Sequence, residues 1–170
     1  MAGESADPVP LRETFESFYL REISAMTSLA YAVCHNHLIA EDIAQEAMLR
    51  AFRRWDRIAA YDNPATWTRR VTINLATSVL RRRALAARVR LRLGTAPHVP
   101  APEATDDSIW QAVRRLPRQQ RAAIALFYLE DRSVHDIAQI MDCSEATARV
   151  HLHRGRQALA RSLGERDADG

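Results

Sequence analysis

The sequence predicts an all-α protein made of two small helical domains. Apolar residues recur at helical spacing along most of the 170 residues, and the hydrophobic fraction of 47% is enough to fill a core. Helix-breaking residues are scarce, with 5 glycines and 7 prolines, and β-branched runs are few. The division into two domains comes from residues 84–107, where an Arg-rich piece is followed by prolines and then by acidic residues. We expect this segment to be a flexible linker.

Composition also narrows the class of protein. No apolar run approaches the roughly 18 residues that a membrane span needs, and the N-terminus lacks the charged-then-apolar order of a signal peptide. We therefore expect a cytoplasmic protein without membrane insertion. The net charge of +3 is uninformative as a total, but residues 61–102 hold eight Arg and one Asp, which sets this segment apart.

The first domain is predicted to span residues 12–83, after a disordered N-terminus at residues 1–11. Apolar periodicity predicts helices at about residues 14–34 and 40–58. A third helix is predicted at about residues 63–83, because a capping asparagine precedes a proline that suits the first helical turn. These three helices give a three- to four-helix bundle.

Two of the predicted helices carry faces that the core does not explain. The second has a mixed polar face beside its core stripe, and the simplest interpretation of that face is a solvated surface. The third has two apolar sides and is surrounded by five arginines, namely Arg69, Arg70, Arg81, Arg82 and Arg83. This helix either buries a tryptophan beside a solvated basic end or offers aromatic and cationic side chains to single-stranded DNA.

The second domain is predicted at residues 108–163, before a charged tail at residues 164–170. Its first helix is expected to point four residues inward, namely Ile109, Trp110, Val113 and Leu116. Pro117 then suits the start of the next helix.

The end of the second domain has a helix-turn-helix pattern. Ser133 and Asp136 predict a capping box, Asp142-Cys143 breaks the helix, and Ser144 is a cap for the next one. One side of that last helix is a core stripe, and the opposite side carries small, hydrogen-bonding and cationic residues. A reader of the DNA major groove needs such a side. The alternative is a surface hairpin with a solvated basic face.

The sequence gives little support for a catalytic site or a metal-binding site. Cys34, His35 and His37 lie close together, but they supply too few ligands at too short a spacing for a good zinc site. No nucleophile–base pairing and no Gly-rich phosphate loop is evident. We expect no metal, no cofactor and no catalytic residue.

Several stretches resemble the extracytoplasmic-function (ECF) group of the sigma-70 family of bacterial RNA polymerase sigma factors. Leu116-Pro-Arg-Gln-Gln-Arg, Ser133-Val-His-Asp-Ile-Ala and Ser144-Glu-Ala-Thr-Ala-Arg-Val-His-Leu-His-Arg are similar to region 4 of that family. Ala40-Glu-Asp-Ile-Ala-Gln-Glu is similar to region 2.2, and Trp67-Thr-Arg-Arg-Val-Thr-Ile-Asn with Leu80-Arg-Arg-Arg is similar to regions 2.3 and 2.4. The order of these motifs along the chain is more specific for this family than any single motif is.

The resemblance implies a protein that directs core RNA polymerase to promoters. The residues that it implies for core polymerase binding are Asp42, Gln45, Glu46, Leu49 and Arg53. The residues that it implies for reading the melted −10 element are Asn63, Trp67, Arg70, Asn74, Arg81 and Arg82. The residues that it implies for binding the −35 element are Ser144, Glu145, Thr147, Arg149, Val150, His151, His153, Arg154 and Arg156.

Finer expectations follow from the same resemblance. The polymerase contacts would be the β′ clamp helices and the β flap, and the free protein would be a monomer held by an anti-sigma factor. Within the holoenzyme it would be associated with the nucleoid. Val150 is expected to contact a thymine methyl group, and binding is expected to weaken as pH rises through about 6.5 if His151 and His153 act as cations. Ser78 stands where the family often has Asp, which bears on the −10 preference.

A different class of protein remains as the alternative. A helix-turn-helix regulator would bind duplex operator DNA without polymerase, usually as a dimer on a palindrome. Residues 1–83 would then be a sensor or dimer domain. That interpretation leaves the Asn74 and arginine-rich helix unexplained.

Overall fold

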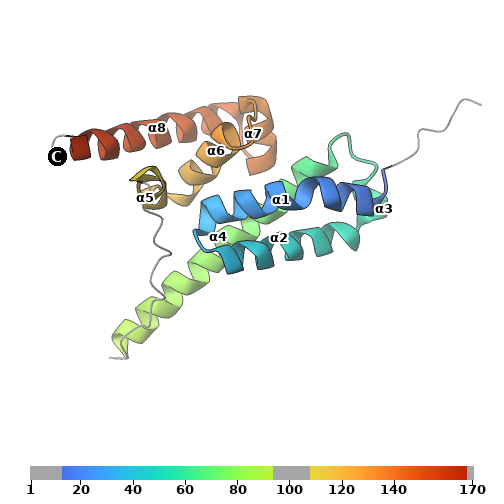
Figure 1. Ribbon diagram of the computed structural model, residues 1–170, viewed down its shortest axis with the longest axis horizontal. Coiled ribbons are helices and arrows are strands. Elements are labelled where there is room, and N and C mark those ends of the chain that lie inside the picture. Colours follow the sequence, from blue (N-terminus) through green and yellow to red (C-terminus); the bar gives the residue numbers. More distant parts are fainter. Residues whose placement is uncertain (1–12, 94–107, 168–170) are drawn as a thin grey trace, which may run out of the picture.

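The computed structural model describes residues 13–93 and 108–167, and these residues form eight helices without a strand (Figure 1). The all-α prediction is therefore confirmed. The predicted disordered N-terminus at 1–11, most of the predicted linker and the end of the predicted tail lie outside the described residues.

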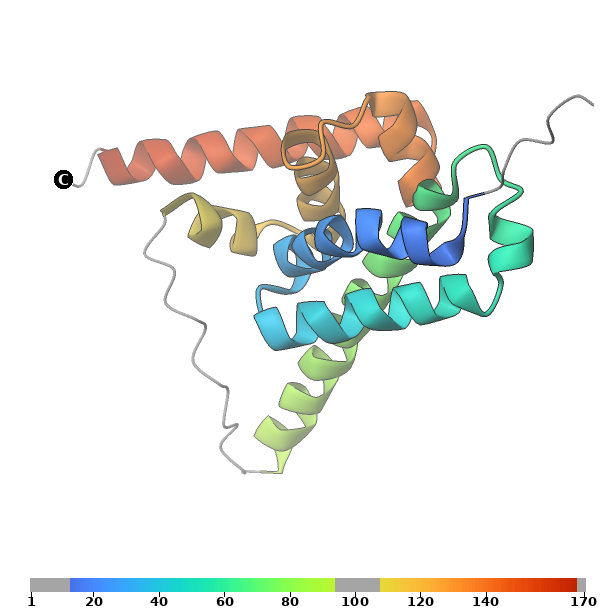
Figure 2. The same ribbon diagram turned by 45° about the vertical axis from the view of Figure 1, so that its right-hand side comes forward.

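The first helical unit consists of α1 (Phe15–Cys34), α2 (His37–Phe52), α3 (Trp55–Ile58) and α4 (Pro64–Arg92). Each long helix begins at a side-chain cap. The backbone N–H of the residue three positions further on donates to the side chain of Thr14, Asn36 or Asn63, respectively. With their ends fixed in this way, α1, α2 and α4 pack against one another (Figure 2).

The helix predicted at residues 40–58 is broken in the structure. α2 ends at Phe52, and Arg53 and Arg54 are exposed before α3 begins. The break turns the Trp55 ring toward α1, where its centroid lies 5.4 Å from that of Phe15 and 4.8 Å from that of Phe18. This aromatic contact joins segments far apart in the sequence, so helical periodicity could not reveal the break.

The helix predicted to end at about Arg83 continues to Arg92. Its last turns extend away from the rest of the molecule, as the green end of α4 in Figure 1 shows. These turns are largely exposed, with Leu85 61% and Val89 47% accessible. The predicted linker at 84–107 thus begins as helix, and its residues 94–107 lie outside the described part of the chain.

The second helical unit consists of α5 (Ser108–Arg115), α6 (Arg118–Tyr128), α7 (Val134–Met141) and α8 (Glu145–Asp167). The capping box of Ser133 and Asp136 is present at the start of α7, as predicted. Asp142 ends α7 in the left-handed conformation with φ 55°, a region that Asp tolerates better than most residues. Ile109 was expected to point inward but is 53% exposed, because it lies on the outer side of the short α5.

The two units share one apolar core. Buried residues of α1 and α4, such as Val33 and Ile73, belong to the same cluster as Leu126 and Ile137 of α6 and α7. α1 lies against α6, and α4 lies against α7 (Figure 2). The Arg121 guanidinium reaches across this boundary and donates to the carbonyl oxygen of Val33 at the end of α1.

Gly155 lies where α8 packs tightly against α6. A Cβ atom at Gly155 would lie 2.8 Å from Cγ1 of the buried Ile124, so a side chain there forces the helices apart. Gly155→Val should lower the free energy of unfolding by about 1–3 kcal/mol, the usual cost of overpacking. Gly164→Val is the control on the same helix, since nothing lies within 4 Å of its Cβ position. Equal urea midpoints for the two variants would contradict the close-packing argument.

His35 should make stability depend on pH. Burial, followed by the charges of Arg121 and Arg114, lowers the pKa of His35 from 6.5 to about 3. Between about pH 3 and 6.5, the unfolded chain therefore binds a proton at His35 that the folded chain does not bind. This contribution to stability is complete above pH 6.5 and is lost as pH falls, by up to about 4 kcal/mol.

Urea unfolding between pH 7 and pH 4 measures this dependence. His35→Asn should flatten the curve, and asparagine accepts the left-handed backbone of this position, where φ is 52°. Leu38→Asn changes an exposed residue of α2 that carries no titratable group, and it should leave the slope unchanged. If His35→Asn keeps the wild-type slope, His35 is not the group that titrates.

Candidate functional site

The helix-turn-helix presents an exposed face on the first turns of α8. Ser144 caps this helix, because its Oγ accepts a hydrogen bond of 3.1 Å from the backbone N–H of Thr147. Ala148 and Leu152 are buried against the core, and the opposite side is open to solvent. The predicted −35 residues on that open side are Thr147, Arg149, Val150, His153 and Arg154. Val150 is 43% exposed, which is unusual for a valine and leaves its methyl groups accessible.

Glu145 and Arg156, two of the predicted −35 residues, contact side chains of other helices. Glu145 lies 2.7 Å from Arg149 and 3.1 Å from the ring of His135, and the His135 hydrogen bond is the main cause that lowers the pKa of Glu145. Arg156 stacks on Phe127, with 4.6 Å to the ring centroid, and donates to the Tyr128 hydroxyl. These contacts orient both side chains beside the exposed face.

His151 lies in surroundings that disfavour its charged form. It is half-buried, on the side of α8 that turns toward the core. Burial and then the charge of Arg154 lower its pKa from the ordinary value of 6.5.

A second exposed face lies along α4. At 100° per residue, Trp67, Arg70, Asn74 and Arg81 fall within about 60° of one another. Asn74 and Arg81 are exposed, and Trp67 and Arg70 are half-buried. Where this face begins, a pocket of about 290 Å³ is lined by Tyr61, Asn63, Thr66, Trp67 and Arg70. Of the predicted −10 residues, Asn63, Trp67 and Arg70 are thus brought together in one pocket. Arg81 lines a separate cavity against the start of α6, and Arg82 lines a groove against α2.

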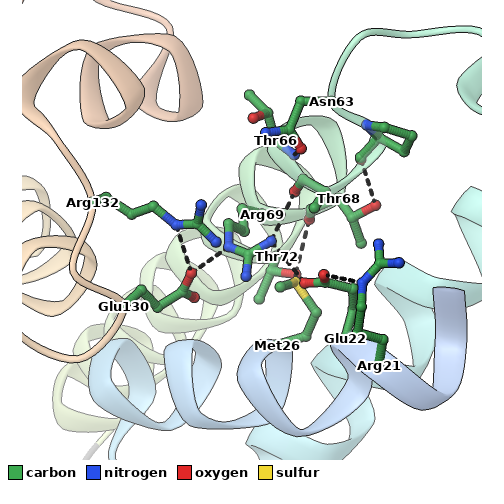
Figure 3. Close-up of polar contacts among 12 residues, drawn as sticks. Arg21, Glu22, Met26, Asn63, Thr66, Thr68, Arg69, Thr72, Glu130 and Arg132 are labelled. Atoms are coloured by element: carbon green, nitrogen blue, oxygen red, sulfur yellow. Dashed lines mark hydrogen bonds and ion pairs between the residues drawn. The ribbon is translucent and has the colours of Figure 1, made fainter.

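Arg69 does not belong to this basic face. It is 3% exposed and lies on the opposite side of α4, where it forms ion pairs with Glu22 of α1 and Glu130 of the α6–α7 connection (Figure 3). Burial alone would raise the pKa of Glu22, but the hydrogen bond from Arg21 and the charge of Arg69 lower it. Arg69 is a structural cation, and the five arginines around this helix therefore do not belong to one surface.

The third candidate surface is a groove between α1 and α2. Four of the five residues expected to bind polymerase line this groove of about 590 Å³, namely Asp42, Gln45, Glu46 and Leu49. Arg53 follows the end of α2 and is exposed outside the groove lining.

Aromatic residues complete the groove, and sequence reasoning did not single them out. Phe15, Tyr19 and Phe52 line it together with Met48. Phe52 is 59% exposed, and its ring centroid lies 5.1 Å from that of Phe15. Phe15 and Tyr19 fit the apolar period of α1, so the sequence pattern gave no reason to separate them from core residues. Phe15 and Tyr19 are four residues apart, so they lie one above the other on a side of α1 next to the stripe that contains Phe18. This spacing is the signal that could have revealed them.

Comparisons with known proteins connect these surfaces to one family. The model of Sigma-70 region 2 matches residues 18–85, and that of Sigma-70, region 4 matches residues 106–159. The ECF RNA polymerase sigma factor SigW of Bacillus subtilis is 30% identical over 79% of this chain and 81% of that protein. The RNA polymerase sigma-E factor of Streptomyces avermitilis is 29% identical over 91% and 88%.

Other relatives are longer. The probable RNA polymerase sigma factor RfaY of Xanthomonas campestris is 31% identical over 84% of this chain, but the match spans only 38% of that protein. Among solved structures, the sigma factor RpoE of Bartonella quintana, in complex with the anti-sigma factor NepR, matches with a TM-score of 0.71. That match covers 88% of this chain and 96% of the other at 24% identity, and it supports the fold.

The chain belongs to the sigma-70 family, as a sigma factor of the ECF group. Members of this family are transcription initiation factors rather than enzymes, and they direct RNA polymerase to promoters. The free-standing operator-binding regulator is accordingly not favoured. Within the described ranges, no helix has the length and apolarity needed to cross a membrane.

Proposed function

We propose that this protein docks on core RNA polymerase through the α1–α2 groove, captures the melted −10 element on α4 and reads the −35 element with α8. The observation that carries the proposal is the two-sided character of α4. One side is buried against α1, whereas Trp67, Arg70, Asn74 and Arg81 gather on another side that the core does not require. Arg70 also bonds to the second unit, but Asn74 and Arg81 are exposed and the core requires neither, so a nucleic-acid function accounts for their placement on this side.

The groove has the composition of a protein-docking site. Leu49 is 41% and Phe52 59% exposed, and Asp42 and Glu46 line the same groove. An apolar centre with acidic groups around it suits a helix that carries apolar and basic side chains. The β′ clamp helices are the partner that we propose for it, and region 4 would make the second contact, with the β flap.

The pocket at the start of α4 suits an unstacked base. Tyr61 and Trp67 supply aromatic surfaces, and stacking of a base on such a ring is worth about 1–3 kcal/mol. Asn63 uses its Oδ1 atom to cap α4, so its amide N–H groups are the donors that it offers to a base. Arg81 and Arg82, further along the helix, would contact phosphates. Captured bases offset the cost of melting, so no catalytic residue is needed.

The face of α8 suits the major groove. Arg149 and His153 would reach base edges or phosphates, Val150 would contact a thymine methyl group, and Arg154 would contact the DNA backbone. Ser144, Glu145, Thr147 and Arg156 would flank this reading face, with Arg156 held by its aromatic contacts.

The proposal also includes the setting in which the protein works. It would be a cytoplasmic monomer when free, nucleoid-associated when bound to polymerase, and controlled by an anti-sigma factor. The solved RpoE relative is bound to its anti-sigma factor NepR, which agrees with a partner of this kind.

Co-purification with core RNA polymerase, followed by transcription from a promoter library, tests the function. New start sites behind a shared −35 and −10 pair are the expected result. Leu49→Asp should weaken core binding more than tenfold, because it places a charge at the apolar centre of the groove. Leu38→Asp is the matched control, since Leu38 is 73% exposed on α2 but does not line the groove. Binding to duplex DNA without core polymerase would favour the regulator interpretation instead.

The promoters recovered in this way allow a test of Val150. Val150→Ser removes apolar surface that would contact a thymine methyl, so the preference at one −35 position should fall about three- to tenfold. Ala160→Ser, at an exposed site further along α8, should leave the preference unchanged. An equal loss on every promoter would show that Val150 contributes to general affinity and not to sequence reading.

A further inference from the structure

We infer that His135 of α7 is a positioning residue for −35 reading, which holds Arg149 of α8 in place through Glu145. His135 is not one of the residues that the family resemblance implies for this element, and it belongs to the helix that precedes the reading helix. The effect on promoter preference rests on the proposed function. The hold on Arg149 in the free protein does not depend on that function.

Four side chains form a hydrogen-bonded chain that crosses from α7 to α8. Gln139 Nε2 lies 3.0 Å from Nε2 of His135, which is one turn earlier on the same helix. The other ring nitrogen of His135, Nδ1, lies 3.1 Å from Oε1 of Glu145, which is the first residue of α8. The second carboxylate oxygen, Oε2, accepts a hydrogen bond of 2.7 Å from Arg149 Nη2. Glu145 therefore uses one oxygen for each of its two neighbours.

The direction of each hydrogen bond follows from the groups themselves. The nitrogen of the Gln139 amide can only donate, so Nε2 of His135 accepts and the ring proton lies on Nδ1. This Nδ1–H then donates to the Glu145 carboxylate, which offers acceptors only. The chain is therefore complete with the ring proton on Nδ1, and each of its members has a definite role.

The hydrogen bond from His135 gives the pair of Glu145 and Arg149 an anchor on another helix. The two side chains are 42% and 62% exposed, and an exposed i, i+4 ion pair by itself contributes little, because both side chains keep other rotamers available. His135 holds the carboxylate from α7, and Gln139 in turn restrains the ring. This second anchor restricts the rotamers of Glu145 and, through it, those of Arg149.

The chain has two consequences for the proposed reading face. Arg149 is held back toward the N-terminal end of α8, which is the part of a recognition helix that contacts base edges. A cation that is already positioned loses less conformational entropy when it binds a base. Glu145, with both oxygens engaged, is kept from accepting a hydrogen bond from the amino group of a cytosine. His135 would thus act on base preference without contacting DNA.

Four variants separate positioning from direct DNA contact. His135→Ala removes the anchor of Glu145, whereas His135→Asn keeps an amide donor near the place of Nδ1. Glu145→Ala removes the link itself, so His135→Ala should add nothing to it in the double variant. Gln119→Ala is the control, because it removes an exposed polar side chain of the second unit that lies outside the chain. Circular dichroism verifies that each variant is folded.

Two measurements on the full chain are needed. Transcription from the promoter library by the reconstituted holoenzyme gives the base preference at each −35 position, and Arg149→Ala identifies the position that Arg149 reads. Heteronuclear NMR relaxation of the free protein gives the order parameter of the Arg149 Nε–H bond, which reports how firmly this side chain is held without DNA or polymerase.

His135→Ala should lower the order parameter of Arg149 and reduce the preference at the position that Arg149 reads by about threefold to tenfold, while the other −35 positions keep theirs. His135→Asn and Gln119→Ala should match the wild type in both measurements.

Three results would overturn the inference. An unchanged order parameter in His135→Ala would show that the ring does not hold Arg149. An equal loss on all sequences would mean that His135 contacts the phosphate backbone, and so would additive losses in the double variant. If no promoter is recovered, the proposed function fails, and the order parameters still decide whether His135 holds Arg149.

Discussion

The burial of the Arg69 charge is the constraint on which the arrangement of helices depends. A guanidinium that is 3% exposed must be paired, since removing one partner from a buried ion pair costs about 3–5 kcal/mol. Glu22 and Glu130 satisfy it from opposite sides, so α1, α4 and the α6–α7 connection have to meet at one point (Figure 3). Apolar packing alone would tolerate small shifts of these helices, whereas charge pairing specifies their positions.

Polar residues on the core side of α4 explain why the sequence did not show which of its polar side chains are buried. Thr68 and Thr72 are fully buried, yet each hydroxyl donates to the backbone carbonyl oxygen four residues earlier. With Arg69 paired as well, three polar side chains occupy positions that an apolar stripe would normally fill. The periodicity of Ile73 and Ala76 found the core side correctly, but only the structure shows which polar residues are internal. The arginines were therefore grouped by proximity in sequence, and one was misplaced.

Features set by local chemistry could be predicted from the sequence, and features set by distant partners could not. The caps at Asn63, Ser133 and Ser144 depend on residues three positions away, and all three are present. The break after Phe52 depends on the packing of Trp55 against α1, and the groove aromatics depend on α1 and α2 lying side by side. Most of the predicted binding residues of α2 and α4 share a face of their helix, because helical geometry is known in advance, but Arg53 and Arg82 do not.

Arg69 and Arg70 show how adjacent residues of one helix can bond to the same neighbouring unit from different sides. Successive side chains on a helix point about 100° apart, so Arg69 faces the buried carboxylates while Arg70 faces the edge of the proposed −10 surface. Both nevertheless bond to the second unit, Arg69 to Glu130 and Arg70 to the carbonyl oxygen of Gln139. A single turn of α4 therefore carries two polar contacts between the units, one through a buried arginine and one through its half-buried neighbour.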